Sequence, residues 1–178
     1  MADFDGIAIL TVLAAHDVDY VVIGGWAAVA QGSPIPTRDV DVVPEKEKDN
    51  LARLSAALTE LDARTRNKDE GLLPFRHDAT SLAGSLFWNL TTKHGDLDLA
   101  FEPSGTQGYA DLRRDAIAVT LRGTPVLLAS LADIVRSKEA AGRDKDRRAL
   151  PILRELVAEQ LRARRPPRTD RTDQSPQA

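Results

Sequence analysis

The sequence places two aspartates, Asp39 and Asp41, one residue apart within a run of valines. Side chains alternate between the two faces of a β-strand, so on a strand both carboxylates project to the same side, with Cα atoms about 6.5–7 Å apart. Two such carboxylates repel each other unless a cation joins them, and hard oxygen ligands suit Mg²⁺, which is commonly shared with substrate phosphates. The alternative is a half-exposed strand with solvated acids, and Asp-x-Asp alone more often indicates that plain strand.

A second alternation of acids follows later in the chain, where Asp96 and Asp98 flank a leucine. If this strand pairs beside the strand of Asp39 and Asp41, a third carboxylate joins the first two. Three acids could coordinate two divalent ions, an arrangement that stabilises both the attacking and the leaving oxygen in nucleotidyl transfer. The polar outer face of a hairpin fits the same residues, and alternation does not decide between Asp96 and Asp98 as the third ligand.

Two further groups of residues suit a phosphate ligand. Gly24 and Gly25 carry no Cβ, so a phosphate can approach their backbone closely, although any strand-to-helix turn can contain such a pair. Lys138, Arg143 and Lys145 would place positive charge at the leaving pyrophosphate as its negative charge develops. A solvated helix junction explains these three cations equally well from the residues alone.

Short β-rich runs must position these side chains. The predicted strands are 20–23, 40–43, 86–92, 96–101, 116–121 and 125–128. The diglycine ends the first strand, and a helix-prone stretch at 26–31 precedes a proline-rich loop. Residues 93–95 are expected to form a hairpin turn because Gly95 can supply a positive φ.

The helical pattern is amphipathic and covers the remaining ordered segments. The predicted helices are 7–14, 45–61, 131–141 and 144–165. Ser130 fits the N-cap of the third, and Pro151 implies a kink or a restart within the fourth. Residues 62–80 are weakly patterned and are predicted to be rich in loops. From Pro166 onward the chain lacks large apolar residues and is predicted to be disordered.

Composition excludes several classes of protein. With 42% apolar and 29% charged residues in 178, neither a fully disordered chain nor a membrane protein fits. The absence of cysteine excludes a disulfide framework and a thiolate zinc site. Residues 1–142 carry 14 basic and 21 acidic groups, a net −7, whereas residues 143–178 carry 10 and 6, a net +4, which permits contact with nucleic acid. No targeting or transmembrane segment is visible, so a cytoplasmic location is expected.

In order and spacing, these motifs resemble the nucleotidyltransferase fold of DNA polymerase β type, specifically its minimal bacterial AbiEii/MenT-like branch. The matching segments are 20–27, 36–42, 95–99, 137–138 and 142–146, within a resemblance that spans roughly residues 18–155. It implies an α+β (α/β) fold, in which helices flank a mixed β-sheet and further helices follow at the C-terminus. The expected organisation is one domain over 1–165, with its core at 18–130 and a helical part at 130–165, followed by a basic, polar tail at 166–178.

The resemblance also implies roles for single residues. Asp39, Asp41 and Asp98 would be the catalytic acids and the ligands of Mg²⁺ or Mn²⁺, with Asp96 as the alternate third acid. The residues expected to bind the NTP are Gly24, Gly25, Arg38, Lys138, Arg143 and Lys145, of which Lys138 is the preferred phosphate ligand. Ile35 stands where related sequences often carry an arginine, and Arg38 is the nearest substitute. Asp146 is expected to orient Arg143 or Lys145 instead of touching substrate.

The activity implied by this resemblance is transfer of NMP from an NTP to an acceptor hydroxyl, with release of pyrophosphate. The branch further implies a toxin of a toxin–antitoxin pair, with the 3′ end of tRNA or another RNA as acceptor and a small antitoxin protein as partner. Two alternatives stay open. One is an antibiotic nucleotidyltransferase acting on an aminoglycoside or a lincosamide, and the other is a nucleotide-binding module without turnover.

Overall fold

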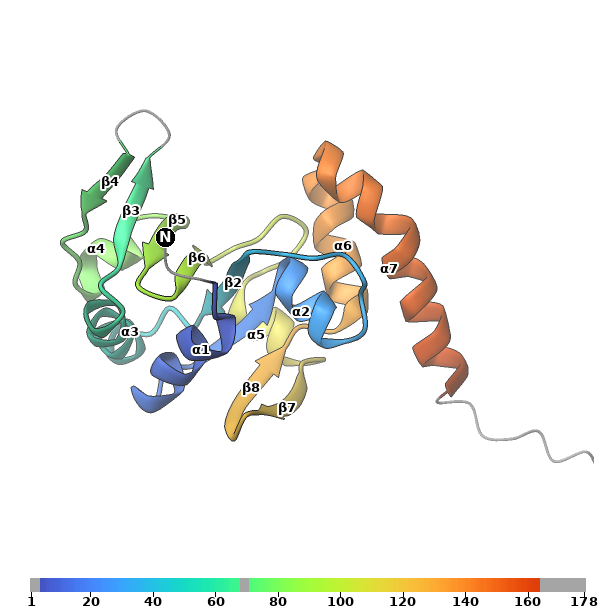
Figure 1. The fold of residues 1–178 in the computed structure, drawn as a ribbon, viewed down its shortest axis with the longest axis horizontal. Helices are drawn as coiled ribbons and strands as arrows, with labels where there is room; N and C mark the ends of the chain where they lie inside the picture. Colours follow the sequence, from blue (N-terminus) through green and yellow to red (C-terminus); the bar gives the residue numbers. More distant parts are fainter. Residues whose placement is uncertain (1–3, 68–70, 164–178) are drawn as a thin grey trace, which may run out of the picture.

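The computed structural model describes residues 4–67 and 71–163, and a single sheet runs through the middle of this part of the chain (Figure 1). Its eight strands lie in the order β4-β3-β5-β6-β2-β1-β8-β7. They are β1 (Tyr20–Ile23), β2 (Asp39–Pro44), β3 (Arg64–Asn67), β4 (Gly71–Pro74), β5 (Phe87–Thr92), β6 (Gly95–Ala100), β7 (Ile117–Leu121) and β8 (Thr124–Leu128). The pairs β1–β8 and β2–β6 are parallel and the other neighbours are antiparallel, so the sheet is mixed as predicted.

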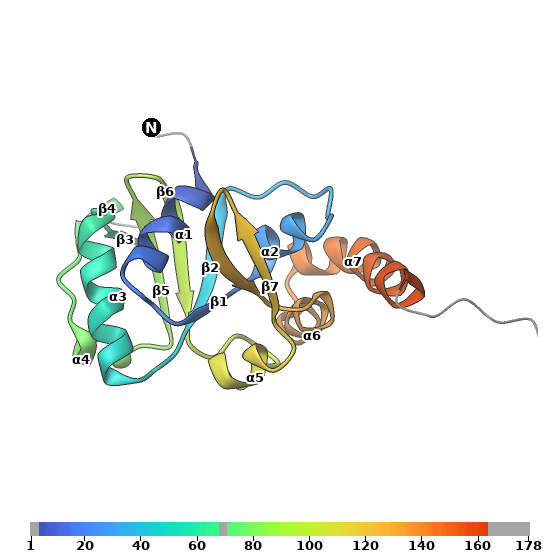
Figure 2. The same cartoon turned by 90° about the horizontal axis from the view of Figure 1, so that it is seen from below.

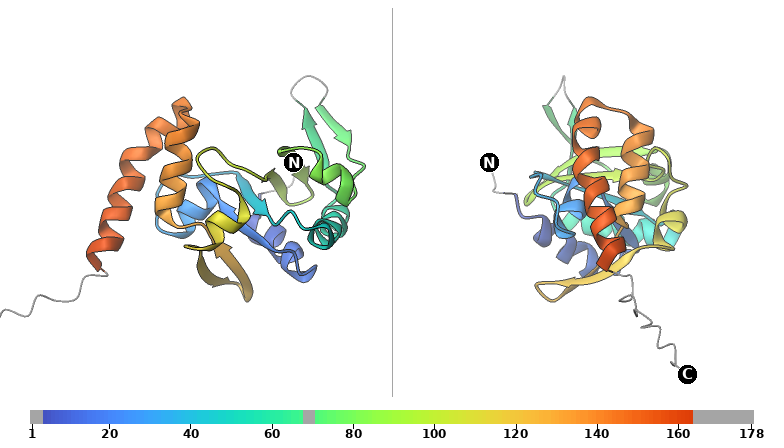
Figure 3. Two further views of the ribbon diagram at one scale, coloured as in Figure 1. Left: turned by 180° about the vertical axis from the view of Figure 1, so that it is seen from behind. Right: turned by 90° about the vertical axis from the view of Figure 1, so that its right-hand side faces the viewer.

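Helices flank the sheet. They are α1 (Gly6–Ala15), α2 (Gly24–Ala30), α3 (Lys48–Glu60), α4 (Ala79–Ala83), α5 (Tyr109–Arg113), α6 (Leu131–Ala141) and α7 (Asp144–Ala163). Helices α1 and α3 pack against each other over one part of the sheet, as the view from below shows (Figure 2). Helices α6 and α7 pack side by side at the opposite end of the molecule, next to α2 (Figure 3). The C-terminal helices predicted from the sequence are therefore present.

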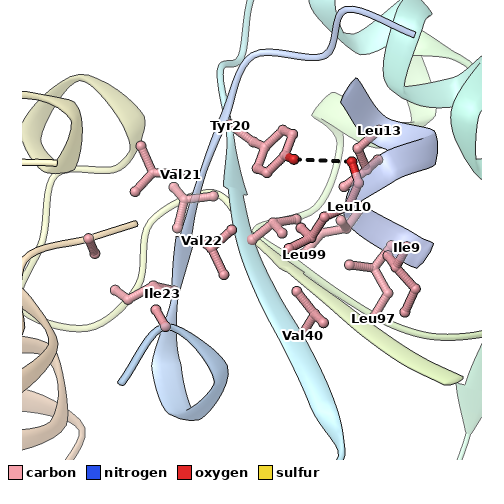
Figure 4. Close-up of a cluster of buried hydrophobic side chains, with 14 of the residues drawn as sticks. Ile9, Leu10, Leu13, Tyr20, Val21, Val22, Ile23, Val40, Leu97 and Leu99 are labelled. Atoms are coloured by element: carbon pink, nitrogen blue, oxygen red, sulfur yellow. Dashed lines mark hydrogen bonds between the residues drawn. The ribbon is translucent and has the colours of Figure 1, made fainter. Parts of the chain in front are cut away.

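Side chains alternate along β2 and β6, so that one face of the sheet is apolar, here called the dry face, and the other is polar. The dry face consists of Val40, Val42, Leu97 and Leu99, all at most 1% exposed, and Ile9, Leu10 and Leu13 of α1 pack on it (Figure 4). The hydroxyl of Tyr20 donates a hydrogen bond of 3.4 Å to the carbonyl of Leu10, which ties α1 to β1. The aspartates that alternate with these apolar residues project from the opposite face of the sheet.

Most of the predicted elements are confirmed, and so are the residues expected to end them. Gly95 has φ +114° at the turn between β5 and β6. Ser130 caps α6, accepting a hydrogen bond of 3.1 Å from the backbone N–H of Asp133, and Gly142 ends that helix in the left-handed conformation. These positions were identifiable because caps and tight turns depend on a few residue types.

The prediction of loops over residues 62–80 was wrong. Strands β3 and β4 pair there as a hairpin, and β3 also pairs with β5, while α4 begins at Ala79. The polar sequence of β3 carries no strand signal of its own, and pairing with a stronger neighbouring strand supplies the stabilisation that local preference lacks. Helix α5 was not predicted either.

The last helix is continuous through Pro151, so no restart occurs there. Its end is described only to Ala163, and the predicted tail at 166–178 lies outside the described residues. Within residues 4–67 and 71–163, no helix combines the length and the apolar character that crossing a membrane requires.

The packing of α1 generates a stability prediction. Leu13 is fully buried in α1, whereas Leu161 of α7 is 62% exposed. Leu13→Ala removes buried methyl groups and leaves a cavity, so it should lower the free energy of unfolding by about 2–5 kcal/mol. Leu161→Ala, the same change in a helix, should cost less than about 0.5 kcal/mol. Urea unfolding followed by circular dichroism measures both, and equal losses would show that α1 does not anchor the core.

Candidate active site

The polar face of the sheet opens into a cavity of about 620 Å³, within the range of about 300–1,000 Å³ typical of small-molecule sites. Strands β1, β2, β5 and β6 contribute to its lining, together with the loop before β2 and helices α6 and α7. The residues predicted from sequence that line it are Gly24, Gly25, Arg38, Asp39, Asp41, Asp98, Lys138, Arg143 and Lys145. The fold thus gathers at one cavity side chains that are more than 100 positions apart in the chain.

The parallel pairing of β2 with β6 sets the acids side by side. Asp41 lies opposite Asp98, and Asp39 lies opposite Asp96. Adjacent strands are about 4.8 Å apart, so the carboxylates of Asp41 and Asp98 rise from neighbouring points of the same face. Asp98 lines the cavity, whereas Asp96 is not among the described residues that do so. Position alone therefore favours Asp98 over Asp96 as the acid next to the pair.

The carboxylate of Asp41 is seated directly against the backbone of Gly24. A Cβ added to Gly24 would lie 2.1 Å from Oδ2 of Asp41, and Gly24 has φ +73°, a conformation that other L-residues rarely adopt. Burial raises the pKa of Asp41 to about 7, and the nearby charges of Asp39 and Asp98 act in the same direction, while Lys145 and Lys138 act in the opposite one. The absence of a side chain at Gly24 therefore makes room for the carboxylate of Asp41, in addition to any approach of a phosphate.

The second glycine makes room for Thr37, the residue that orients Asp39. A Cβ on Gly25 would lie 3.0 Å from Oγ1 of Thr37. The hydroxyl of Thr37 donates a hydrogen bond to Oδ1 of Asp39. The diglycine, the loop before β2 and the first acid therefore form one packed unit.

An arginine from β3 reaches across β5 to the acids of β6. Arg66 makes an ion pair with Asp96 and another, of 2.8 Å, with Oδ1 of Asp98. The hydroxyl of Thr91 donates a hydrogen bond of 2.7 Å to Asp96. Burial raises the pKa of Asp98, and Arg66 lowers it only in part, so the net pKa stays above the ordinary value of an aspartate. Arg66 therefore helps to keep Asp98 ionised beside two other acids.

The cations on the far wall are organised by a buried acid. Asp146 is 0% exposed, and its two oxygens accept from Lys138 Nζ at 2.9 Å and from Arg143 Nε at 2.7 Å. Burial alone would raise the pKa of Asp146, but these two charged hydrogen bonds outweigh burial and the net pKa is lowered. Asp146 thus contacts Arg143, as expected, and Lys138 in place of the expected Lys145. Among the described residues, no carboxylate lies within 4.0 Å of Lys145 or Arg38.

The carboxylates of the cavity offer some of the ligands that a divalent cation needs, but not a complete ligand shell among the described residues. Within the described parts of the chain, no three acidic or histidine side chains already surround one point as a ligand shell. Thr37 contacts Asp39 and Arg66 contacts Asp98, and the assignment of the three carboxylates as metal ligands stays a prediction. Asp39 and Asp41 nevertheless supply adjacent hard oxygens beside cations, which suits a small ion that completes its shell with water and phosphate.

Sequence reasoning missed several residues of the site. Arg66 lies on a strand that was not predicted, and Thr37 carries no distinguishing signal. Phe87 and Asn89 line the cavity from β5, and the hairpin register places Asn89 opposite Asp98. Thr92 pairs opposite Gly95 in the observed hairpin. The turn predicted at 93–95 would instead pair residue 92 with residue 96 and set Asn89 opposite Leu99, so the predicted hairpin did not identify these two residues.

The raised pKa of Asp41 predicts how stability depends on pH in the absence of divalent cations. The pKa is higher in the folded chain, so the stabilisation that accompanies protonation is complete below pH ~4 and is lost as the pH rises towards ~7. Asp41→Asn stays neutral. We expect it to match the wild type at pH 4 and to be more stable by on the order of 2–4 kcal/mol at pH 8.

Chemical denaturation at both pH values measures this difference. Asp49→Asn, at an acid in the first turn of α3, serves as the control and should show no such growth between pH 4 and pH 8. A difference between Asp41→Asn and the wild type that stays constant would contradict the burial of a charge at this position.

Comparison with known proteins identifies the architecture. The chain matches no protein-family model and no curated protein sequence. Its structure resembles that of the lincosamide antibiotic adenylyltransferase LnuA, bound to lincomycin, with a TM-score of 0.57 and 13% identity over 86% of this chain and 99% of that one. It also resembles the antibiotic-resistance factor ANT(2'')-Ia, with a TM-score of 0.50 and 15% identity over 88% and 93% of the two chains.

At sequence identities of 13% and 15%, the resemblance to these two structures shows a shared fold only. The AbiEii/MenT-like branch stays a prediction. The chain has the nucleotidyltransferase fold that its motifs predicted from the sequence.

Proposed function

We propose that the protein is a Mg²⁺-dependent nucleotidyltransferase that transfers NMP from an NTP to an acceptor hydroxyl. One observation carries this proposal. Asp39, Asp41 and Asp98 project from neighbouring parallel strands into one cavity whose opposite wall presents cations. Carboxylates facing a cationic wall fit a substrate that brings both a divalent cation and a polyphosphate.

The charged residues that line the cavity have distinct tasks in this reaction. Asp39 and Asp41 would hold the cation, which supplies positive charge that neutralises the triphosphate. Lys145 and Arg38, which have no carboxylate partner among the described residues, bind phosphate oxygens, and Lys138 and Arg143 add positive charge from positions fixed by Asp146. The preferred phosphate ligand therefore shifts from Lys138 to Lys145.

Asp98 is the residue assigned to the acceptor. Its carboxylate takes the proton of the acceptor hydroxyl, and the resulting oxygen attacks the α-phosphorus. A bond forms between that oxygen and phosphorus, the bond from phosphorus to the bridging oxygen breaks, and pyrophosphate leaves with the electron pair. Positive charge on the opposite wall stabilises the leaving group as its charge develops.

We extend the proposal to an RNA acceptor, the 3′ end of tRNA, and to a role as the toxin of a toxin–antitoxin pair with a small antitoxin protein as partner. The support is the order and spacing of the motifs, together with the excess of basic residues from Arg143 onward. Growth arrest on induction, absent for Asp39→Ala, is the expected cellular result. LnuA and ANT(2'')-Ia are described as antibiotic-modifying or antibiotic-resistance proteins, so lincomycin and tobramycin belong in the assay as competing acceptors.

The assay incubates the protein with α-³²P-labelled NTPs, Mg²⁺ and total RNA. We expect labelled RNA with the wild type and a loss of about 10²–10³-fold or more with Asp39→Ala and Asp41→Ala. Asp115→Ala, at an exposed acid outside the cavity, should retain full activity. Equal labelling by the wild type and both site variants would refute the assignment, and omission of Mg²⁺ should abolish labelling.

The ion pair of Arg66 with Asp98 predicts a change in the pH profile. Arg66 lowers the pKa of Asp98, so Arg66→Ala should raise that pKa and move the acid limb of kcat/KM to higher pH. Arg64→Ala, two positions away on β3 and paired with the exposed Asp62, is the matched control and should leave the limb in place. An unchanged limb in Arg66→Ala would show that Asp98 does not act as the base.

A further inference from the structure

One side of the cavity has no task in the transfer of NMP. Phe87 lines the cavity there and yet is 53% exposed, the largest exposed fraction of any aromatic residue in the described chain. An exposed phenyl ring inside a cavity is a surface that a ligand can cover. Assigning an acceptor to this side rests on the proposed function.

The order of the strands places this surface on the acceptor side. Across the cavity the strands run β1, β2, β6 and β5, so the diglycine lies on one side of the acids and β5 lies on the other. Asn89 pairs opposite Asp98, and Phe87 pairs opposite Ala100. Phe87 and Asn89 are two residues apart on a strand and share a face, with Phe87 about 6.5–7 Å beyond Asn89. A group whose hydroxyl reaches Asp98 therefore has its body over these two side chains.

The chemistry of this surface suits a planar ring with polar edges. A phenyl face accepts a nucleobase by stacking, whichever base it is, and an amide can donate to or accept from the edge of the base. Ala100, Pro103 and Ser104 complete this side of the cavity with small or apolar groups. Among the described residues, no charged side chain lines the cavity from β5.

The charges of the cavity argue against a polycationic acceptor. The described acids that line it are Asp39, Asp41 and Asp98, and all three already have tasks in the reaction. The lining cations are Arg38, Lys138, Arg143 and Lys145. An aminoglycoside, which carries several ammonium groups, would find no spare lining carboxylate in the described chain, whereas the phosphates of an RNA would meet favourable charge.

We infer that Phe87 and Asn89 form a subsite for the terminal nucleobase of an RNA acceptor. The base stacks on the ring of Phe87 and its edge contacts the amide of Asn89. Its ribose then extends towards β6, where the 3′-hydroxyl meets Asp98. The subsite determines acceptor affinity and leaves the binding of the NTP unchanged.

Kinetics with a short single-stranded RNA as acceptor test this inference. Phe87→Ala should raise KM for the RNA about tenfold or more, with KM for the NTP unchanged, and Phe87→Trp should restore binding because its ring also stacks. The matched control is Leu86→Ala, a neighbouring residue that is 46% exposed and is not among the described residues lining the cavity. It should behave as the wild type. A rise in KM for the NTP, or no change in KM for the RNA, would overturn the inference.

A second RNA removes the base and keeps the hydroxyl. An otherwise identical RNA ending in an abasic ribonucleotide should bind the wild type at least as weakly as the intact RNA binds Phe87→Ala, because it loses the contacts with both Phe87 and Asn89, and Phe87→Ala should weaken it no further. An equal loss for both RNAs on Phe87→Ala would show that Phe87 does not contact the base. Transfer to tobramycin in preference to RNA would also overturn the inference.

Binding without catalysis separates this inference from the proposed function. Fluorescence anisotropy of a 5′-fluorescein-labelled RNA, measured without NTP, reports the subsite even if no transfer occurs. The same selective loss with Phe87→Ala and with the abasic end supports the subsite in the absence of turnover. Equal anisotropy curves for the wild type and Phe87→Ala would refute it even in an active enzyme.

Discussion

Three carboxylates on neighbouring strands repel one another, and the rest of the site is arranged around that repulsion. The parallel pairing of β2 with β6 sets Asp41 directly opposite Asp98, with Asp39 two residues away. Partial burial is the larger cause that raises the pKa of Asp41 to about 7, and the charges of Asp39 and Asp98 add to it, so ionising Asp41 here costs free energy. A site that holds acids at such a cost is prepared for a positively charged ligand.

The charges that offset this repulsion come from distant parts of the chain. Arg66 reaches Asp98 from β3, beyond one edge of the cavity, and Lys145 lowers the pKa of Asp41 from the opposite wall. Asp146, a buried residue of α7, binds Lys138 of α6 and Arg143 of the junction between the two helices. Packing of the two C-terminal helices is thus part of the electrostatics of the site. Loss of either helix would remove positive charge that the acids need.

Features that depend on residues close together in the sequence were predicted correctly, whereas features that depend on contacts between distant segments were not. The Asp-x-Asp strands and the cap of α6 depend on alternation or on single turn residues, and both were identified correctly. The position of Arg66 depends on pairing between β3 and β5, which no local pattern of residues 62–80 shows. Gly24 makes room for the carboxylate of Asp41 because the start of α2 contacts β2, and this contact between separate segments was not visible in the sequence.

The proposed chemistry depends on Asp39 and Asp41 together holding a divalent cation against the triphosphate of a nucleotide. The most direct test is a crystal structure with Mn²⁺ and a non-hydrolysable NTP analogue, in which anomalous scattering locates the metal. We expect an anomalous peak bonded to oxygens of both aspartates and of the triphosphate, with Asp98 on the opposite side of the α-phosphate. A metal and nucleotide bound elsewhere, with both aspartates still solvated, would contradict this assignment.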